Sequence, residues 1–133
     1  MRGKRGKVEA AGPVKDGEGA HPVAVAWRPI LCEVVRAFVR GDYELAEGVP
    51  SVEAVPASKA RRIREYVADY GATLIELPEG TWETSCAQWT GHRWDVLVDL
   101  WTKEEGRSDL VLHMDVAESG AGYRFEVHLV YVP

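Results

Sequence analysis

The last third of the chain alternates apolar and polar residues in three runs, at residues 93–101, 109–116 and 123–132. A period of two is typical of β-strands that bury one face. The segments between the runs, residues 102–108 and 117–122, are short and rich in turn-forming residues. We therefore expect the three strands to pair as an antiparallel meander. This pattern predicts a fold and no particular reaction.

Two amphipathic helices are predicted ahead of these strands. The first covers residues 27–39, with a proline in its first turn, apolar residues three or four positions apart and Gly41 as its stop. The second covers residues 59–70, with Ser58 as its N-terminal cap. Gly71 is expected to end it, because glycine adopts the left-handed conformation at low cost.

Two further segments are expected to extend the sheet. Residues 73–77 form a short apolar strand ended by Pro78, which suits a sheet edge. Residues 88–89 are expected to pair backwards onto the first long strand across the turn at residues 90–91. The predicted fold is therefore α+β, with two N-terminal helices packed on one face of a four- to five-stranded antiparallel curved sheet.

The alternation separates two faces of the predicted sheet. One register is entirely apolar or aromatic, which identifies it as the core side. Its members are Trp94, Val96, Val98, Leu100, Leu110, Leu112, Met114, Val116, Tyr123, Phe125, Val127, Leu129 and Tyr131. The other register mixes charged and apolar residues, which suits a surface covered by a partner. Its members are Arg93, Asp95, Leu97, Asp99, Trp101, Asp109, Val111, His113, Asp115, Arg124, Glu126, His128, Val130 and Val132.

Charge is distributed unevenly along the chain. Residues 1–22 carry five Lys or Arg against three Asp or Glu, whereas residues 23–133 carry eleven against eighteen. We expect the first segment to be a disordered tail and the second to be a single α+β domain. An acidic domain repels phosphate backbones, so nucleic acid is not an expected ligand. A basic protein is the partner that this charge suits.

Hydropathy and cysteine usage favour a cytoplasmic protein. The basic start of the chain is not followed by the apolar run of about seven or more residues that a secretory signal needs. A membrane span, which needs about eighteen apolar residues, is not expected either. Two cysteines do not make a disulfide framework, and we expect Cys32 to be a small core residue. Cys86 has no base next to it in the sequence, which favours an inert thiol over a catalytic one.

The candidate functional residues lie on the mixed register and on the turn at residues 103–109. We expect them to form an interaction surface. They are Asp95, Asp99, Trp101, Glu105, Arg107, Asp109, His113 and His128. The turn also has a structural interpretation, which we favour over its use as a recognition tip. In that interpretation Arg107 binds Glu105 or Asp109, and Ser108 caps a backbone amide.

Two chemical alternatives arise because His113 and His128 share a face with carboxylates. The nearby carboxylates are Asp99, Asp115 and Glu126. Together these residues are of the types that ligate zinc, but an ordinary ladder of cross-strand ion pairs explains them as well. We favour the ladder and predict no metal and no cofactor. An acid–base pair such as Asp99 with His113 is the catalytic alternative, and we do not assign catalytic residues.

Residues 94–110, which include the run WTKEEGRSDL, and the ending VYVP resemble a family of small uncharacterised bacterial domains. The resemblance covers residues 28–133 and implies no established activity. The order of helices before a curved sheet is also similar to the cystatin-like and nuclear-transport-factor-2-like layout, which implies a cone that can hold a pocket. Some folds of that layout are isomerases or dehydratases and others only bind proteins, so the layout does not choose between these functions.

The leading hypothesis is a small protein-binding domain, an immunity or accessory protein of a toxin system that binds a basic protein through the mixed sheet face. It rests on the acidic domain, on that face and on the lack of a catalytic motif, together with analogy to small acidic bacterial domains. The alternative is a small-molecule or enzymatic pocket between helices and sheet, lined by Tyr66, Tyr70, Asp99 or His113. An enzyme is the less expected outcome, and the oligomeric state is not predicted.

Overall fold

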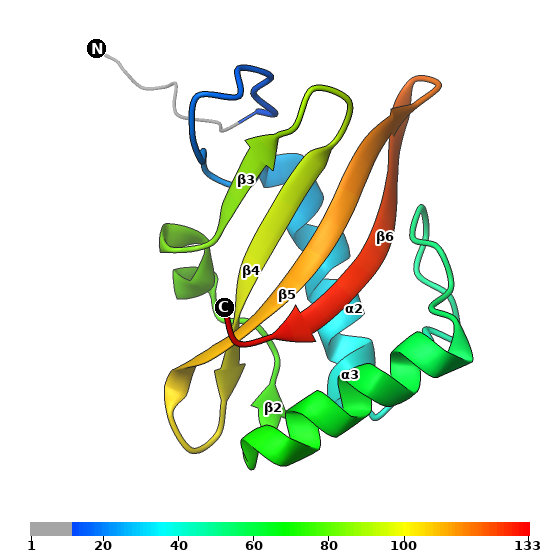
Figure 1. Cartoon of the computed structure of the whole chain (residues 1–133), viewed down its shortest axis with the longest axis vertical. Coiled ribbons are helices and arrows are strands. Elements are labelled where there is room, and N and C mark those ends of the chain that lie inside the picture. The colour runs from blue at the N-terminus through cyan, green and yellow to red at the C-terminus, as the bar shows by residue number, and fades with distance from the viewer. Residues whose placement is uncertain (1–11) are drawn as a thin grey trace.

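The computed structural model describes residues 12–133, and its centre is a five-stranded antiparallel sheet (Figure 1). The strands are β2 (Leu74–Ile75), β3 (Cys86–Trp89), β4 (Trp94–Thr102), β5 (Gly106–Ser119) and β6 (Gly122–Tyr131). β4, β5 and β6 form the predicted meander, and both β2 and β3 pair with the other edge of β4. The α+β fold, with helices before an antiparallel sheet, is confirmed.

The helices lie at different places on this sheet. α2 (Arg28–Val39) follows the short 3-10 turn η1 (Val25–Trp27) and lies across one sheet face, whereas α3 (Ala57–Tyr70) packs against β6 (Figure 1). A second 3-10 turn, η2 (Glu79–Glu83), lies between β2 and β3 in sequence and contacts β4. Within residues 12–133, none of the helices has both the length and the apolar character needed to cross a bilayer.

Of the two predicted ends of α3, only the C-terminal end is correct. Gly71 follows its last residue with a φ of 82°, in the left-handed conformation that was expected. At the other end the helix begins at Ala57, directly after Pro56, and no side chain caps it. The prediction of Ser58 as the cap was wrong, because Ser58 already lies inside the first turn.

The hydrophobic core fills the space between α2 and the sheet. Leu31, Val34 and Phe38 of α2 are buried against it. Trp27 is 2% exposed, and its ring meets the ring of Trp94 edge-on with a centroid distance of 5.2 Å. The three long strands contribute to this core the side chains of Trp94, Val96, Val98, Leu100, Leu110, Leu112, Met114, Val116, Phe125, Val127 and Val130.

A bulge at His128 overturns one part of the predicted core. His113 pairs with Leu129, but its next neighbour in β5 pairs two residues earlier in β6, so His128 is left as an extra residue. One extra residue reverses the alternation beyond it. Val130 is therefore fully buried, and Leu129 and Tyr131 lie on the side of His113. The predictions that Tyr131 faces the core and that Val130 faces away from it were wrong, whereas Leu129 is only partly buried but still packs against the core.

Part of the predicted tail contacts the sheet. His21 pairs with Ala87 of β3 through two backbone hydrogen bonds of 2.8 Å. The indole nitrogen of Trp94 donates a hydrogen bond of 3.0 Å to the carbonyl oxygen of Val14. These contacts within residues 12–22 were not predicted, and residues 1–11 of the tail lie outside the described residues.

Candidate functional site

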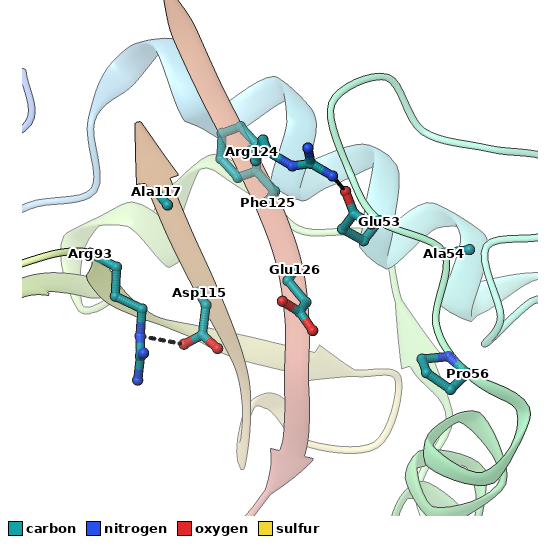
Figure 2. A pocket seen from close by; sticks show the side chains of 9 residues that line it. All are labelled: Glu53, Ala54, Pro56, Arg93, Asp115, Ala117, Arg124, Phe125 and Glu126. Carbon is teal, nitrogen blue, oxygen red and sulfur yellow. Dashed lines mark hydrogen bonds and ion pairs between the residues drawn. The ribbon is translucent and has the colours of Figure 1, made fainter. Parts of the chain in front are cut away.

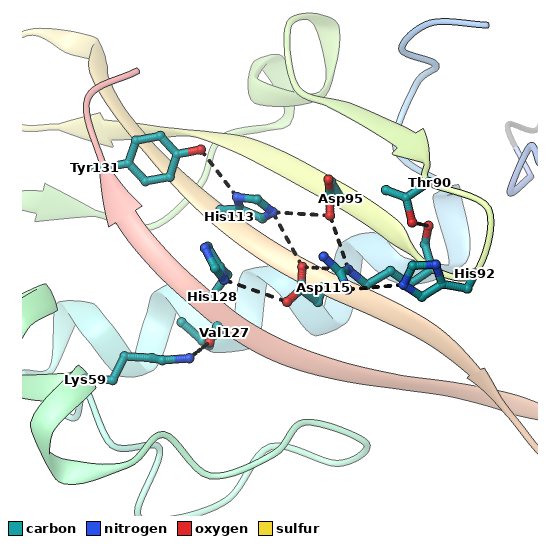
Figure 3. Close-up of polar contacts among 10 residues, drawn as sticks. Lys59, Thr90, His92, Asp95, His113, Asp115, Val127, His128 and Tyr131 are labelled. Atoms are coloured by element: carbon teal, nitrogen blue, oxygen red, sulfur yellow. Dashed lines mark hydrogen bonds and ion pairs between the residues drawn. The ribbon is translucent and has the colours of Figure 1, made fainter. Parts of the chain in front are cut away.

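One sheet face carries a compact group of polar side chains, and no helix between residues 12 and 133 covers that face (Figure 1). Asp95 comes from β4, and His113 and Asp115 come from β5. Asp95 pairs directly with Asp115 across the two strands, and His113 lies two positions along β5. Because side chains alternate along a strand, all three point to the same side. We call these three residues the Asp–His cluster (Figure 3).

The cluster meets at the imidazole of His113. The Nε2 atom of His113 lies 3.5 Å from Oδ1 of Asp95 and 3.5 Å from Oδ1 of Asp115. On the other side of the ring, Nδ1 lies 3.3 Å from the hydroxyl oxygen of Tyr131. The ring of His128 has its centroid 4.5 Å from that of His113, and its Nδ1 lies 3.9 Å from Oδ2 of Asp115 (Figure 3). Both His113 nitrogens therefore face oxygen atoms.

Arg93 offsets part of the negative charge. Its Nε lies 3.4 Å from Oδ1 of Asp95 and 3.4 Å from Oδ1 of Asp115. The side chains of His113 and Asp115 are 16% and 22% exposed, whereas that of Arg93 is 42% exposed. Within the described part of the chain, Nε2 of His113 and Oδ1 of Asp115 are buried and form no hydrogen bond. Buried polar atoms without a partner are uncommon in folded proteins and call for an explanation.

A hollow of about 510 Å³ adjoins the cluster at the outer edge of β6 (Figure 2). It forms where the segment before α3 pairs with β6, since the amide of Glu53 donates a hydrogen bond of 2.9 Å to the carbonyl of Phe125. Arg124 forms an ion pair with Glu53 at one side, and Arg93 with Asp115 at the other (Figure 2). The lining residues are Glu53, Ala54, Pro56, Arg93, Asp115, Ala117, Arg124, Phe125 and Glu126.

Asp99 lies on the same face but is held by other residues. It pairs with Val111 of β5, and its carboxylate accepts a hydrogen bond from the hydroxyl of Thr84. Its backbone amide donates a hydrogen bond of 2.9 Å to the hydroxyl oxygen of Ser85. The carboxylates that meet His113 are therefore those of Asp95 and Asp115.

Trp101, a predicted interaction residue, is half-buried near the end of β4. Its ring lies against two glycines, because a Cβ atom built at Gly80 or Gly106 would stand 4.0 or 3.8 Å from ring carbons. Its indole Nε1 is buried without a hydrogen-bond partner in the described residues. Only part of this side chain is therefore available to a partner.

The turn between β4 and β5 is tied to α3. The hydroxyl of Tyr70 donates a hydrogen bond of 2.6 Å to Glu105 and accepts one of 3.1 Å from the backbone amide of Asp109. The predicted ion pair of Arg107 with Glu105 or Asp109 does not form between these residues, and Arg107 is exposed. Ser108 accepts a hydrogen bond from the amide of Leu110, as predicted. Glu105 therefore has a structural contact in place of a free carboxylate.

The two thiols are poor nucleophiles in this environment. Burial raises the pKa of the Cys86 thiol, and the nearby carboxylate of Asp99 raises it further. Burial also raises the pKa of Cys32. A raised pKa lowers the thiolate fraction at neutral pH, which opposes a catalytic thiol at either position.

Comparison with known protein families assigns the chain to one family. A family model described as Domain of unknown function (DUF7668) matches residues 35–133. The chain belongs to this family. The matched region contains α3, all five strands and every member of the Asp–His cluster. No curated protein and no solved structure matches the chain. The expectation of a domain family without an established activity is confirmed.

Three residues around the cluster were not among the predicted interaction residues: Asp115, Arg93 and Tyr131. The alternation placed Asp115 and Arg93 on the correct face, but Asp115 was named only as one of three carboxylates in the metal alternative, and without the register of β4 against β5 nothing singled out Arg93. Tyr131 reaches His113 only because of the bulge in β6. A prediction of which residues face each other across β4 and β5 would have found Asp115 opposite Asp95.

Proposed function

We propose that this protein is a small bacterial protein-binding domain of the cytoplasm, which binds a basic partner protein through the sheet face opposite α2. We call that side the open face. The proposal is carried by the concentration of carboxylates on a sheet face that no helix in the described chain covers. An immunity or accessory role in a toxin system is one form of such binding, by analogy with small acidic bacterial domains. The free cysteines Cys32 and Cys86 support the cytoplasmic assignment.

Charge on the open face supports a basic partner. Its carboxylates are those of Asp95, Asp99, Asp115 and Glu126. Arg93 lies between two of them, and Arg124 is engaged by Glu53. The face therefore keeps a negative charge that a basic surface would complement. Complementary charge mainly raises the association rate and selects the partner.

Apolar side chains on the same face supply contact area. Leu97 and Leu129 are partly exposed there, and Tyr131 presents its ring beside His113. Leu97 and Leu129 both pair with His113 across their strands, so they flank the cluster. Protein interfaces commonly combine an apolar centre with a charged rim. The open face has apolar and charged side chains within three neighbouring strands, with the charged cluster between Leu97 and Leu129.

The alternative of a pocket between helices and sheet has less support. Asp99 and His113 lie on the open face, away from α2. Tyr66 is 44% exposed on α3, and the hydroxyl of Tyr70 is bonded to Glu105. Neither the hollow at β6 nor any of three smaller ones on the described surface, one of which adjoins it, is lined by these four residues.

The proposal is tested by capturing partners from a lysate of the source organism and then titrating the purified partner by calorimetry. Glu126→Lys reverses an exposed charge on β6 next to the cluster. Glu65→Lys is the matched control, since Glu65 is an exposed glutamate on α3. We expect Glu126→Lys to weaken binding at least about tenfold. We expect Glu65→Lys to change it by less than about twofold.

Two outcomes would contradict the proposal. One is a partner whose affinity and salt dependence are the same for the wild type and for Glu126→Lys. The other is the recovery of no specific protein at low ionic strength, where charge attraction is strongest.

A further inference from the structure

We propose that the Asp–His cluster binds a divalent transition-metal ion, Zn²⁺ in the first instance. The ligands are Nε2 of His113 and one carboxylate oxygen each from Asp95 and Asp115. These ligand atoms all lie within 4.8 Å of one another. One imidazole nitrogen with two carboxylate oxygens is a set of donors that zinc accepts in proteins. The inference goes beyond the proposed protein binding and does not depend on it.

The spacing of the ligand atoms fits the size of the ion. Zinc lies about 2.0–2.2 Å from nitrogen and oxygen ligands in tetrahedral sites, which places neighbouring ligand atoms about 3.3–3.6 Å apart. Nε2 of His113 is 3.5 Å from Oδ1 of Asp95 and from Oδ1 of Asp115. A good hydrogen bond between these groups would be shorter, at about 2.7–3.2 Å.

The sequence favoured a ladder of ion pairs, but ion pairs alone do not give every polar atom of this cluster a hydrogen bond. The ladder leaves Nε2 of His113 and Oδ1 of Asp115 buried and without hydrogen bonds, although they face each other. Burying polar atoms that form no hydrogen bond is costly. A cation bound between them satisfies both atoms at once. The same two atoms are therefore the ones that a metal ion would use.

Each of the two buried ligands also has an outer partner. A metal-bound histidine usually donates a hydrogen bond from its other ring nitrogen to an oxygen, which fixes the ring. Nδ1 of His113 has such an oxygen 3.3 Å away, on Tyr131 (Figure 3). Nδ1 of His128 lies 3.9 Å from Oδ2 of Asp115, the oxygen that does not face Nε2. Tyr131 can therefore orient the ring of His113, and His128 lies close to the second oxygen of Asp115.

Arg93 competes with the ion for the same oxygens. Its Nε lies 3.4 Å from Oδ1 of both Asp95 and Asp115, and it offsets part of their negative charge in the metal-free protein. Its side chain is 42% exposed, so it has a path to solvent when a doubly charged ion takes its place. The proposal thus predicts opposite effects for two kinds of variant. Loss of a ligand weakens metal binding, and loss of the arginine charge tightens it.

The test measures Zn²⁺ affinity of the full chain by competition with a chromophoric chelator, with Co²⁺ absorption as a report on ligand geometry. We expect one ion per chain. His113→Gln and Asp115→Asn should weaken binding more than about 100-fold, and Tyr131→Phe about tenfold. Arg93→Gln should tighten binding several-fold. His21→Gln should leave it unchanged, because it removes a partly exposed histidine that lies outside the cluster, 2.8 Å from Asp16.

Circular dichroism shows whether each variant folds. Arg93→Gln keeps all three ligands. Its Zn²⁺ affinity therefore tests whether the cluster is the binding site even if a ligand variant unfolds. The proposal is overturned if the wild type binds no Zn²⁺ or if His21→Gln loses as much affinity as His113→Gln. It is also overturned if Arg93→Gln binds no more tightly than the wild type. Because no partner protein is added, failure here leaves the proposed protein binding untouched.

Discussion

His113 lies at the centre of the polar contacts on the open face. One ring nitrogen faces Tyr131 and the other faces two carboxylates, and the side chain is 16% exposed. Because the His113 side chain is so enclosed, a partner or an ion can contact only one edge of its ring. The more exposed neighbours, His128 and Arg93, lie on either side of it.

Cys86 gives a prediction at the scale of one residue. Burial and the charge of Asp99 raise the pKa of its thiol, so the thiol form should persist to higher pH than in a free cysteine. The midpoint of the pH dependence of iodoacetamide alkylation should therefore lie above that of free cysteine. Measured in a Cys32→Ser background, Asp99→Asn should shift it downwards. A midpoint at or below that of free cysteine would contradict this assignment.

Single residues were predicted correctly where alternation alone decides their side. Asp95, His113 and His128 do lie on the open face, as the period of two indicated. The catalytic alternative paired Asp99 with His113, but the carboxylate of Asp99 bonds to Thr84 instead, since η2 and the residues after it pass beside β4. The alternation of apolar and polar residues in a strand does not indicate which non-strand segments will contact that strand.

At the scale of elements, two register irregularities determine which residues meet. Near the β4–β5 turn Trp101 pairs with Arg107, but Asp99 pairs with Val111, so β5 contains two extra residues there. Counting back from the turn without them would place Asp95 opposite His113. The observed register places it opposite Asp115. Turn residues predicted the hairpin, but the side-chain pattern carried no sign of the irregularities, because two extra residues preserve the alternation.

The bulge at His128 predicts a difference between two neighbouring residues of β6. Val130 is fully buried and Leu129 is only partly buried. A charge placed at Val130 has no solvent and no partner, so Val130→Asp should cost several kcal/mol, much of the roughly 5–15 kcal/mol that stabilises a domain. Leu129→Asp should cost clearly less. Urea unfolding of both variants measures this, and the reverse order would show that β6 has no bulge here.

At the scale of the whole molecule, the sheet separates two roles. One face binds α2 and forms the core, and the other presents the Asp–His cluster, Glu126 and partly exposed apolar side chains. Composition predicted an acidic domain, and the order of elements predicted its architecture. The position of α3 beside β6 and the hollow at that edge depend on how the segment before α3 pairs with β6. That pairing uses backbone atoms and leaves no side-chain pattern in the sequence.

The most direct test of the open face as the binding surface is an amide NMR titration of the labelled protein with its captured partner. We expect the largest shift changes in β4, β5 and β6 at residues whose side chains lie on the open face, centred on Asp95, His113 and Asp115. Amides of α2 and of the exposed side of α3 should change little. Changes confined to the helices, with β4 and β5 unaffected, would contradict the account.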